Sequence, residues 1–319
     1  MHTAYYTNNT LNWLTGRTVP GYLQVLGSAN SNATVTLWST VGQFPTPAGV
    51  LTRPLRHGDY FSAELVLNSS TGAVWHTITN LAVRQNGTNA DYATTNIGSV
   101  FLPQSPETFA YDLDGNVTNT GRWMLTWDAE NRPTSFASLV SAPSASKRKV
   151  DCSYDHAWRR TQKIVSSWSG GYEAQSTNRF VYDGWNLVAE LASDGTLLRS
   201  HVWGLDASGS EQGAGGVGGL LATTIHTGPF AGTYFPAYDG NYNVVAYVRA
   251  SDGQVVAHYD YGPFGELLRA SGTVAREFNF LFSTKYYDWE TRFYYYGSGG
   301  VHSGSGTGYF GQLISGFDF

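Results

Sequence analysis

The sequence predicts an all-β protein built as a chain of β-hairpins. Of its 319 residues, 37 are glycine and 15% are aromatic, while only 13% are charged, so it is rich in residues that turn sharply or cover pleated surfaces. Short segments that alternate apolar and polar residues recur along the chain, with turn residues between them. No window shows the amphipathic pattern and the caps of an α-helix. These three observations favour strands throughout.

The expected strands can be placed in chain order. They cover residues 33–38, 60–67, 74–83, 187–191, 197–203, 244–249 and 255–261. Two pairs of strands flank Ser193-Asp194-Gly195 and Ser251-Asp252-Gly253. Asp-Gly suits the positive φ angles of a tight hairpin turn, because glycine lacks the Cβ that would clash there. Residues 186–203 and 243–261 are therefore predicted to be two similar hairpins.

A Tyr-Asp pair recurs beside the strands and is often followed by glycine and asparagine. The pairs are Tyr111-Asp112, Tyr154-Asp155, Tyr182-Asp183, Tyr238-Asp239 and Tyr259-Asp260, with Trp127-Asp128 as a variant. Their spacing is irregular, which excludes the even repeat of a propeller. The pattern favours hairpins joined by loops of variable length.

The repeat divides the chain into three predicted segments. Residues 1–108 form a divergent β-rich N-terminal segment, residues 109–296 carry the repeat, and residues 297–319 form a Gly/Ser-rich tail with little secondary-structure signal.

The Tyr-Asp repeat and the segment that ends it resemble a known protein family. The run YDYGPFGELLRASGTVAREFNFLFSTKYYDWETRFYYYG, residues 259–297, resembles the RHS repeat-associated core, and the Tyr-Asp pairs resemble YD repeats. The resemblance implies a sheet of successive hairpins that spirals into an open or closed shell or barrel. In bacterial toxin systems such shells enclose a C-terminal toxin, and in animal teneurins a related barrel supports adhesion.

The chain departs from the family pattern in two places. Where the family has Glu-Thr-Gly, this chain has Glu290-Thr291-Arg292, so an arginine replaces the turn glycine. Residues 297–319 also lack the family's usual continuation toward an aspartate-based self-cleavage motif. No cleavage residue is carried over, and no toxin domain is expected within this segment.

Charge and composition exclude several classes of function. A net charge of −5 lacks the basic footprint of nucleic-acid binding, and the only basic cluster, Lys147-Arg148-Lys149, is interpreted as a solvated loop. Cys152 is the single cysteine, which excludes an intrachain disulfide, and we expect it to pack as a small hydrophobe. No apolar run is long enough to span a membrane. We expect a secreted or cell-surface protein whose export signal lies outside this sequence.

The sequence predicts no catalytic residue, no cofactor site and no metal site. The run GAGGVG, residues 213–218, matches a dinucleotide-binding pattern but precedes LLATTIHTG, which lacks the required helix. The eight histidines have no ligand spacing, and His76, His201 and His258 are interpreted as strand residues.

Several aspartates lie beside turns, and two close carboxylates can share a proton in self-cleavage. We instead interpret them as turn residues whose side chains accept backbone hydrogen bonds. These aspartates are Asp112, Asp114, Asp155, Asp183, Asp239 and Asp260.

Three functions follow from these predictions. The first is a non-catalytic shell module that acts as a scaffold for a polypeptide cargo. The second is a filament subunit, because the ends of an open sheet can pair head-to-tail between copies. The third is a shell that cleaves itself with an aspartyl pair. The predicted partners are thus a polypeptide cargo or copies of the same chain, without nucleic acid.

Overall fold

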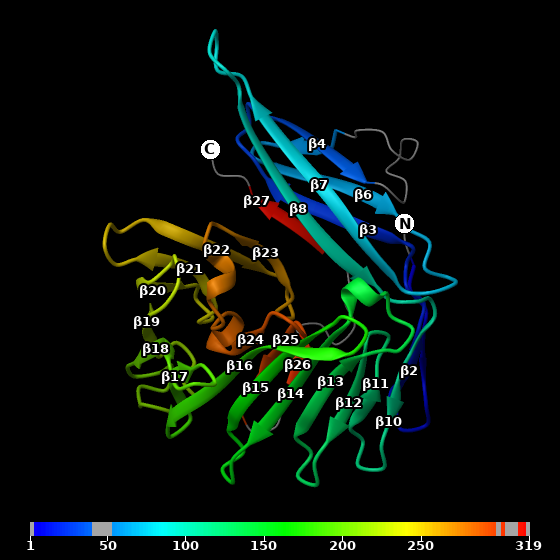
Figure 1. Ribbon diagram of the computed structural model, residues 1–319, viewed down its shortest axis with the longest axis vertical. Coiled ribbons are helices and arrows are strands. Elements are labelled where there is room, and N and C mark those ends of the chain that lie inside the picture. Colours follow the sequence, from blue (N-terminus) through cyan, green and yellow to red (C-terminus); the bar gives the residue numbers. More distant parts are fainter. Residues whose placement is uncertain (1–2, 40–52, 298–300, 304–311, 317–319) are drawn as a thin grey trace. The chain divides into compact units, whose positions relative to one another are not determined.

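The computed structural model describes residues 3–39 and 53–297, and the backbone of residues 301–303 and 312–316 (Figure 1). The chain divides into two compact units. The first comprises Met1–Met124, Ser138–Lys147 and Tyr309–Phe319, and the second comprises Leu125–Ala137 and Arg148–Gly308. The described residues contain strands and three short 3₁₀ turns but no α-helix, so the predicted all-β class is confirmed.

The first unit contains three small sheets and also the first strands, up to Met124, of the larger sheet described below. The strands of the three small sheets are β1 (Tyr6–Asn8), β2 (Leu14–Arg17), β3 (Tyr22–Ser28), β4 (Thr34–Ser39), β5 (Leu55–His57), β6 (Tyr60–Val66), β7 (Val74–Arg84), β8 (Tyr92–Leu102), β9 (Glu107–Thr108) and β27 (Gln312–Gly316). Their orders are β1-β2-β9, β27-β3-β6-β5 and β4-β7-β8. The 3₁₀ turn η1 (Ser144–Ser146) also belongs to this unit.

Two of these sheets share one aliphatic core. Buried and exposed residues alternate along β3 and β4, as expected for strands with one face turned inward. Leu23 on β3, Leu37 on β4 and Ile78 on β7 are fully buried in the same cluster. The first unit is therefore a small β-sandwich held by hydrophobic burial.

The prediction of little secondary structure in residues 297–319 is wrong for two segments. β26 (Val301–Ser303) pairs with β25 (Phe293–Tyr295), and β27 pairs in parallel with β3 from Gln312↔Gln24 to Gly316↔Ser28. The free edge of β3 supplies backbone donors and acceptors that local sequence does not show.

Fourteen strands form one antiparallel sheet in chain order. They are β10 (Ala110–Tyr111), β11 (Val117–Asn119), β12 (Trp123–Trp127), β13 (Pro133–Ser138), β14 (Arg148–Tyr154), β15 (Arg160–Trp168), β16 (Tyr172–Asp183), β17 (Asn186–Leu191), β18 (Leu197–Trp203), β19 (Leu220–Ile225), β20 (Gly232–Tyr238), β21 (Val244–Arg249), β22 (Val255–Tyr261) and β23 (Leu267–Ser271). Among the described residues this sheet is open, with β10 and β23 at its edges.

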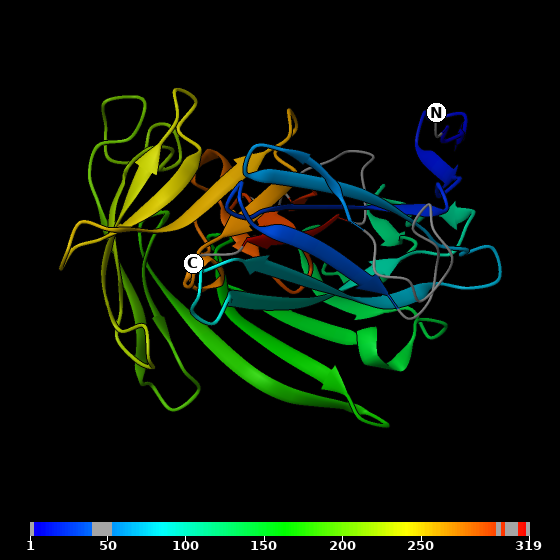
Figure 2. The ribbon, with the colours of Figure 1, turned by 90° about the horizontal axis from the view of Figure 1, so that it is seen from above.

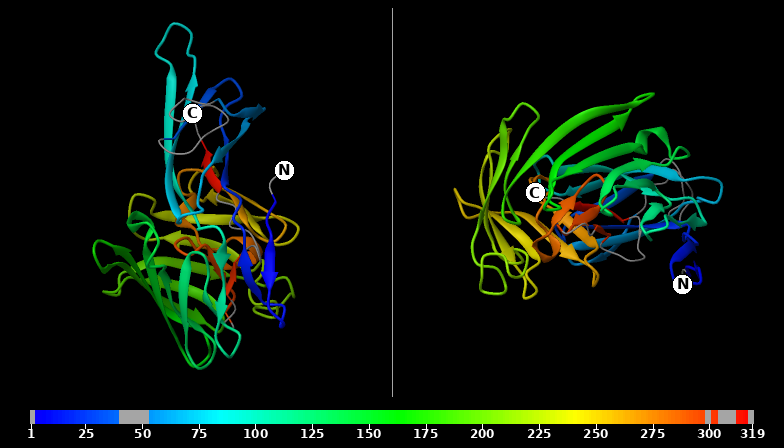
Figure 3. Two further views of the ribbon diagram at one scale, coloured as in Figure 1. Left: turned by 90° about the vertical axis from the view of Figure 1, so that its right-hand side faces the viewer. Right: turned by 90° about the horizontal axis from the view of Figure 1, so that it is seen from below.

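Within the second unit the sheet curves around the segment that follows it (Figures 2 and 3). We call residues 274–297 the core segment. It contains η2 (Ala275–Glu277), η3 (Phe282–Thr284), β24 (Tyr286–Asp288) and β25. Its side chains share a buried cluster with residues of β19 to β22. The concave face of the sheet therefore has its own cover.

Most strand predictions are confirmed to within one residue at each end. The expected segments correspond to β4, β6, β7, β17, β18, β21 and β22. The interpretation of the basic cluster as a loop is wrong for Arg148 and Lys149, which begin β14, where Lys149 pairs with Asp151 at 2.9 Å. The three-segment division of the chain stays a prediction.

Candidate functional site

The turns after the Tyr-Asp pairs share one geometry. In the turn after β14, the Asp155 carboxylate accepts hydrogen bonds from the backbone N–H groups of Ala157 and Arg159, both at 2.9 Å. The Arg159 side chain then donates from Nε to the same carboxylate at 2.8 Å. The turns at Asp112, Asp128 and Asp239 repeat this pattern, with Asn116, Arg132 and Asn243 as the closing residues.

A left-handed residue precedes each closing residue. The φ angles are +86° at Gly115, +59° at Asn131, +67° at Trp158 and +61° at Tyr242. Asn131, Trp158 and Tyr242 thus adopt a conformation that most side chains avoid. The carbonyls of Trp158 and Tyr242 accept hydrogen bonds from Tyr295 and Thr284 of the core segment, at 3.0 and 2.9 Å.

The tyrosines of the pairs connect neighbouring strands. The hydroxyl of Tyr154, at the end of β14, donates to the carbonyl of Pro133, the first residue of β13, at 2.9 Å. Tyr182, Tyr238 and Tyr261 repeat this contact with the first residues of β15, β19 and β21. At the end of β18, Trp203 substitutes for tyrosine and donates to Leu187 at 2.7 Å. Burial raises the pKa of these tyrosines, so they stay protonated donors.

The turn interpretation of the aspartates is confirmed at Asp112, Asp155 and Asp239 but is wrong at Asp260. Asp260 lies inside β22, where its carboxylate pairs with Arg269 on β23 at 2.6 Å. The residue in the tyrosine position of that hairpin is Tyr261, not Tyr259. Asp114 contributes its backbone N–H to Asp112, and Asp183 lies at the two-residue turn between β16 and β17.

The core segment packs on the concave face through aromatic rings. Phe278 stacks on Tyr247 with a centroid distance of 3.7 Å and an interplanar angle of 10°. The Tyr247 hydroxyl donates to the carbonyl of Phe280 at 3.0 Å, and Tyr259 donates to Ala275 at 2.6 Å. Large rings therefore fill the interior, and their polar atoms satisfy the backbone of an irregular segment.

Four charged side chains meet at the end of β24 and form what we call the Asp288 cluster: Arg160, Lys163, Asp288 and Glu290. Arg160 donates to both oxygens of Asp288, at 2.6 and 3.1 Å, and Lys163 Nζ lies 2.9 Å from Asp288 and 3.1 Å from Glu290. The side chains of Arg160, Lys163 and Asp288 are 3%, 4% and 7% exposed. Burial alone would raise the pKa of Asp288, but the two cations outweigh it and lower this pKa.

A second buried carboxylate, Glu190 on β17, also faces the core segment. It accepts hydrogen bonds from Tyr286 at 3.2 Å and from Asn178 at 3.1 Å. Arg199 and His201 approach it to 3.6 Å each. Burial opposes ionisation of Glu190, yet His201 and Arg199 prevail and lower its pKa to about 2. Arg199 also pairs with Glu277 of the core segment at 3.2 Å, so this cluster holds the segment as well.

The glycine run has a packing role. Residues 213–218 form turns that lead into strand β19, so the helix required for a dinucleotide site is absent from this part of the described chain. A Cβ at Gly216 would lie 3.2 Å from the Trp203 ring, and one at Gly218 would lie 2.3 Å from the Tyr242 ring. The Asp206 carboxylate fixes the loop by accepting from the N–H groups of Ala214 and Gly216.

Arg292 occupies the glycine position of the family pattern in a left-handed conformation. Its φ angle is +64°, and its N–H donates to the carbonyl of Asp288 at 2.7 Å. The turn has therefore kept its backbone geometry without the residue that adopts it most easily.

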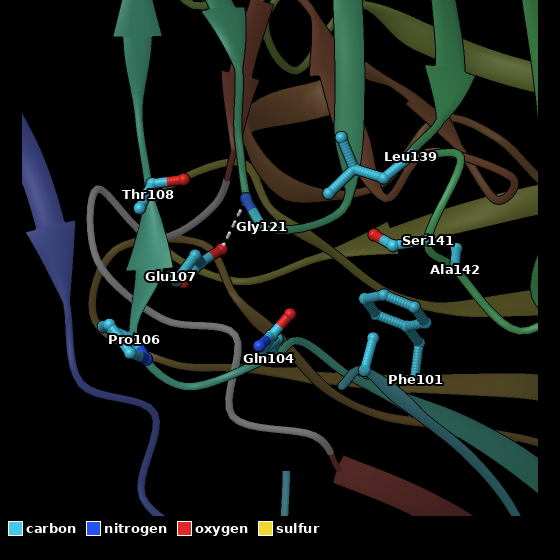
Figure 4. A pocket seen from close by; sticks show the side chains of 10 residues that line it. Phe101, Gln104, Pro106, Glu107, Thr108, Gly121, Leu139, Ser141 and Ala142 are labelled. Carbon is cyan, nitrogen blue, oxygen red and sulfur yellow. Dashed lines mark hydrogen bonds between the residues drawn. The ribbon is translucent and has the colours of Figure 1, made fainter. Parts of the chain in front are cut away.

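The first unit contains a pocket of about 170 Å³ beside Glu107 (Figure 4). The Glu107 carboxylate forms an ion pair with Arg17 and accepts a hydrogen bond from the N–H of Gly121 at 3.1 Å. Its side chain is fully buried. The volume is below the range of ordinary small-molecule sites.

The three histidines predicted to be strand residues lie in strands. His76 is buried on β7 beside Ser39, and burial lowers its pKa, while His201 and His258 lie on β18 and β22. Among residues 3–39 and 53–297 no three His, Cys, Asp or Glu side chains gather in a way that could hold a metal ion. No helix in the described part of the chain has the length and apolar character needed to cross a membrane.

Sequence reasoning missed the charged residues of the concave face. Arg160, Lys163, Glu190 and Arg199 lie in strands whose local patterns look ordinary, and only their position opposite the core segment gives them a role. Asp288 lies within the core motif, where its partners could not be identified.

The large sheet is thus an open antiparallel sheet of consecutive hairpins, whose turns after the Tyr-Asp pairs share one geometry and whose concave face is covered by the core segment. No family model matches the sequence. It is 26% identical over 216 residues to the tRNA3(Ser)-specific nuclease WapA of Bacillus spizizenii, covering 67% of this chain and 8% of that protein. It is also 26% identical over 206 residues to the tRNA nuclease WapA of Bacillus subtilis, covering 64% and 8%.

The chain thus spans about 8% of the length of the curated relatives it matches. Among solved structures, the Photorhabdus luminescens Tc holotoxin pore is matched with a TM-score of 0.45 and 13% identity, covering 93% of this chain and 13% of that chain. The crystal structure of TcdB2-TccC3-TEV gives a TM-score of 0.43 and 14% identity, covering 92% and 13%. The resemblance to the RHS/YD-repeat proteins is confirmed.

Proposed function

We propose that this chain is a non-catalytic scaffold module of a larger, exported RHS-type protein, and that its concave sheet face encloses a polypeptide cargo. One observation carries the proposal. The concave face binds an irregular polypeptide segment, residues 274–297, through backbone hydrogen bonds, stacked rings and compensated charges. A face built in this way suits the enclosure of a polypeptide.

The charged residues of the concave face support a structural role. Asp288 has two cationic partners, and Glu190 has two hydrogen-bond donors and two nearby basic side chains. The pKa of each carboxyl is lowered, whereas an aspartyl pair that cleaves peptides needs one carboxyl that keeps its proton at working pH. Neither carboxyl is therefore assigned a role in self-cleavage.

The nuclease activity named for the relatives is assigned, in this proposal, to the part of those proteins that this chain does not match. The purified chain, incubated with tRNA, is expected to leave it intact. Specific cleavage that is abolished by a substitution in this chain would overturn the non-catalytic assignment.

The mass of the freshly expressed chain tests self-cleavage. We expect one species at 34.8 kDa. Two fragments that sum to this mass, formed at a rate independent of protein concentration, would show cleavage of the chain by itself.

The scaffold role is tested by expressing the chain together with the segment that follows it in its full-length protein. We expect that segment to resist trypsin as long as the scaffold is folded. Asp288→Asn, which weakens the concave face, is expected to expose it. Equal digestion of the segment with and without the scaffold would contradict enclosure.

A further inference from the structure

Asn86 and Gly87 form the only Asn-Gly pair in the sequence. They lie in the connection between β7 and β8, whose tip extends past the other strands of this unit (Figures 1 and 3). The backbone reverses there, because the Asn89 N–H donates to the Asn86 carbonyl at 3.1 Å. Gly87, with a φ angle of +65°, is the first central residue of this turn. The pair thus lies outside the strands, in a turn that glycine makes possible.

The backbone nitrogen of Gly87 is accessible. Gly87 is exposed, and a Cβ placed on it would meet no atom within 4 Å beyond its chain neighbours. Within the described residues its N–H donates to no protein acceptor, since β7 ends at Arg84 and β8 begins at Tyr92. The nitrogen that follows Asn86 is therefore held neither by strand pairing nor by packing.

The side chain of Asn86 is held weakly. Among the described residues one hydrogen bond holds it, from Asn86 Nδ2 to the carbonyl of Ala90 at 3.2 Å, which is the long end of the normal range. Asn68 provides a contrast, because its Oδ1 accepts from the N–H of Ser70 at 2.9 Å and the residue after it, Ser69, is 2% exposed. The side-chain carbon of Asn86 can therefore approach the next backbone nitrogen more easily than that of Asn68.

We propose that Asn86 is a site of spontaneous covalent modification, at which the Gly87 nitrogen attacks the side-chain amide and converts Asn86 to aspartate or isoaspartate. The nitrogen forms a bond to Cγ, the bond from Cγ to Nδ2 breaks, and the proton of the attacking nitrogen leaves with the amide group as ammonia. Water then adds to one carbonyl of the resulting succinimide ring and breaks the bond from that carbonyl to the nitrogen. Water enters and ammonia leaves, so the reaction needs no oxidant or reductant.

Glycine at position 87 favours this ring closure. It has no Cβ to hinder the approach of its nitrogen to Cγ, and its backbone adopts conformations that other residues avoid. The reaction is therefore expected at Asn86 before any other asparagine of the described chain.

The product changes the charge of the hairpin tip. Asp91 lies in the same connection, and its carboxylate accepts from the Asn86 N–H at 3.2 Å. A second carboxylate at position 86 repels that of Asp91 and removes the donor to Ala90. Because β7 and β8 pair at all eleven residues without a register shift, we expect the loosening to stay at the tip and to leave the sandwich folded.

Peptide mapping by mass spectrometry tests the proposal on the folded full chain, incubated at pH 7 for increasing times. Trypsin releases residues 85–122 as one peptide. We expect the mass gain of an amide that becomes a carboxyl group, and fragmentation should place it at residue 86 while Asn68 stays intact. Asn86→Gln should abolish this gain, and Gly87→Ala should slow it by about tenfold or more, because the added Cβ hinders ring closure.

Asn89→Gln, in the same connection, is the matched control and should leave the rate at Asn86 unchanged. Hydrogen exchange of the aged chain should be faster than that of the fresh chain in residues 85–91 and unchanged in β3. An Asn86 that stays intact while another asparagine of the described chain reacts would overturn the proposal. So would a rate that Gly87→Ala leaves unchanged, or one that Asn89→Gln lowers as much as Gly87→Ala does.

Discussion

The two units bury charged groups with opposite results. In the first unit, Glu107 has one cationic partner, Arg17, and one backbone donor, and burial prevails, so its pKa is raised. In the second unit, Asp288 has two cationic partners, and their attraction prevails over burial, so its pKa is lowered. One partner is insufficient to offset the desolvation of a buried carboxylate here, whereas two are sufficient.

The interiors of the two units also differ in the kinds of side chain that fill them. The core of the sandwich consists of aliphatic residues such as Leu23, Leu37 and Ile78. The concave face of the second unit is filled by tyrosine and phenylalanine rings and by the Asp288 cluster. The sandwich therefore depends on hydrophobic burial, while the attachment of the core segment depends also on charge and hydrogen bonds.

Asp288→Asn should produce the largest loss of stability. It leaves Arg160 and Lys163 buried with too little negative charge, and we expect a loss of about 3–5 kcal/mol in the second unit, measured by urea unfolding at pH 7. The matched control is Asp252→Asn, whose exposed pair with Arg249 should contribute less than about 1 kcal/mol. Equal losses in the two variants would show that burial does not determine the effect.

Leu37→Ala should cost about 3 kcal/mol in the first unit, because it removes a fully buried side chain from the aliphatic core. This loss is expected to be the same at pH 4 and pH 7, since no ionisable group is involved. A loss that changes with pH by more than about 1 kcal/mol would contradict the view that this core is purely hydrophobic.

The losses of stability caused by Glu190→Gln and by Glu107→Gln should change with pH in opposite directions. The pKa of Glu190 is lowered from 4.5 to about 2, so its contribution is present above pH 4.5 and disappears as the pH falls toward 2. The pKa of Glu107 is raised above 4.5, so its contribution is greatest below pH 4.5 and is lost as the pH rises through the raised value.

Unfolding free energies at several pH values between 2.5 and 7 provide the measurement. The difference in unfolding free energy between the unmodified chain and Glu190→Gln should become smaller as the pH falls. The difference between the unmodified chain and Glu107→Gln should become smaller as the pH rises. Parallel pH profiles for the two variants would refute the contrast between the units.

Arg292→Gly should give the smallest effect, a gain of about 0.5–1 kcal/mol, because glycine adopts a φ of +64° without strain. Arg292→Ala is the control, since it removes the charge but keeps the Cβ. Burial lowers the pKa of Arg276, and the charge of Arg292 lowers it further, so the two guanidinium groups repel one another. If the alanine variant is stabilised as much as the glycine variant, the gain comes from relief of this repulsion and not from the backbone.

The sequence predicts the fold class, the strands and the turn chemistry because these are local. Alternation of apolar and polar residues predicts the strands. The spacings Asp-x-x-x-Asn and Asp-x-x-x-Arg recur in the turns, where the last side chain donates a hydrogen bond to the aspartate. The prediction of a turn role for Asp260 is wrong because the Tyr-Asp pair is shifted by one residue in this hairpin. Tyr261 therefore makes the contact between strands that the tyrosine of the pair makes elsewhere.

The concave face could not be predicted for a different reason. Asp288 is separated by 128 residues from Arg160 and by 125 from Lys163, and these residues meet only because the sheet curves and the core segment folds back on it. Strand β27 could not be predicted for the same reason, since its pairing with β3 joins segments near opposite ends of the chain. Contacts of this kind leave no periodic signal in a single sequence.

The central claim is that compensated charges hold the core segment on the concave face of the second unit. Hydrogen exchange of the unmodified chain and of Asp288→Asn, followed by mass spectrometry at pH 7, tests it most directly. We predict that residues 274–297 lose protection while peptides from β3, β4 and β7 keep theirs. Unchanged exchange in residues 274–297, or an equal loss of protection in both units, would contradict the claim.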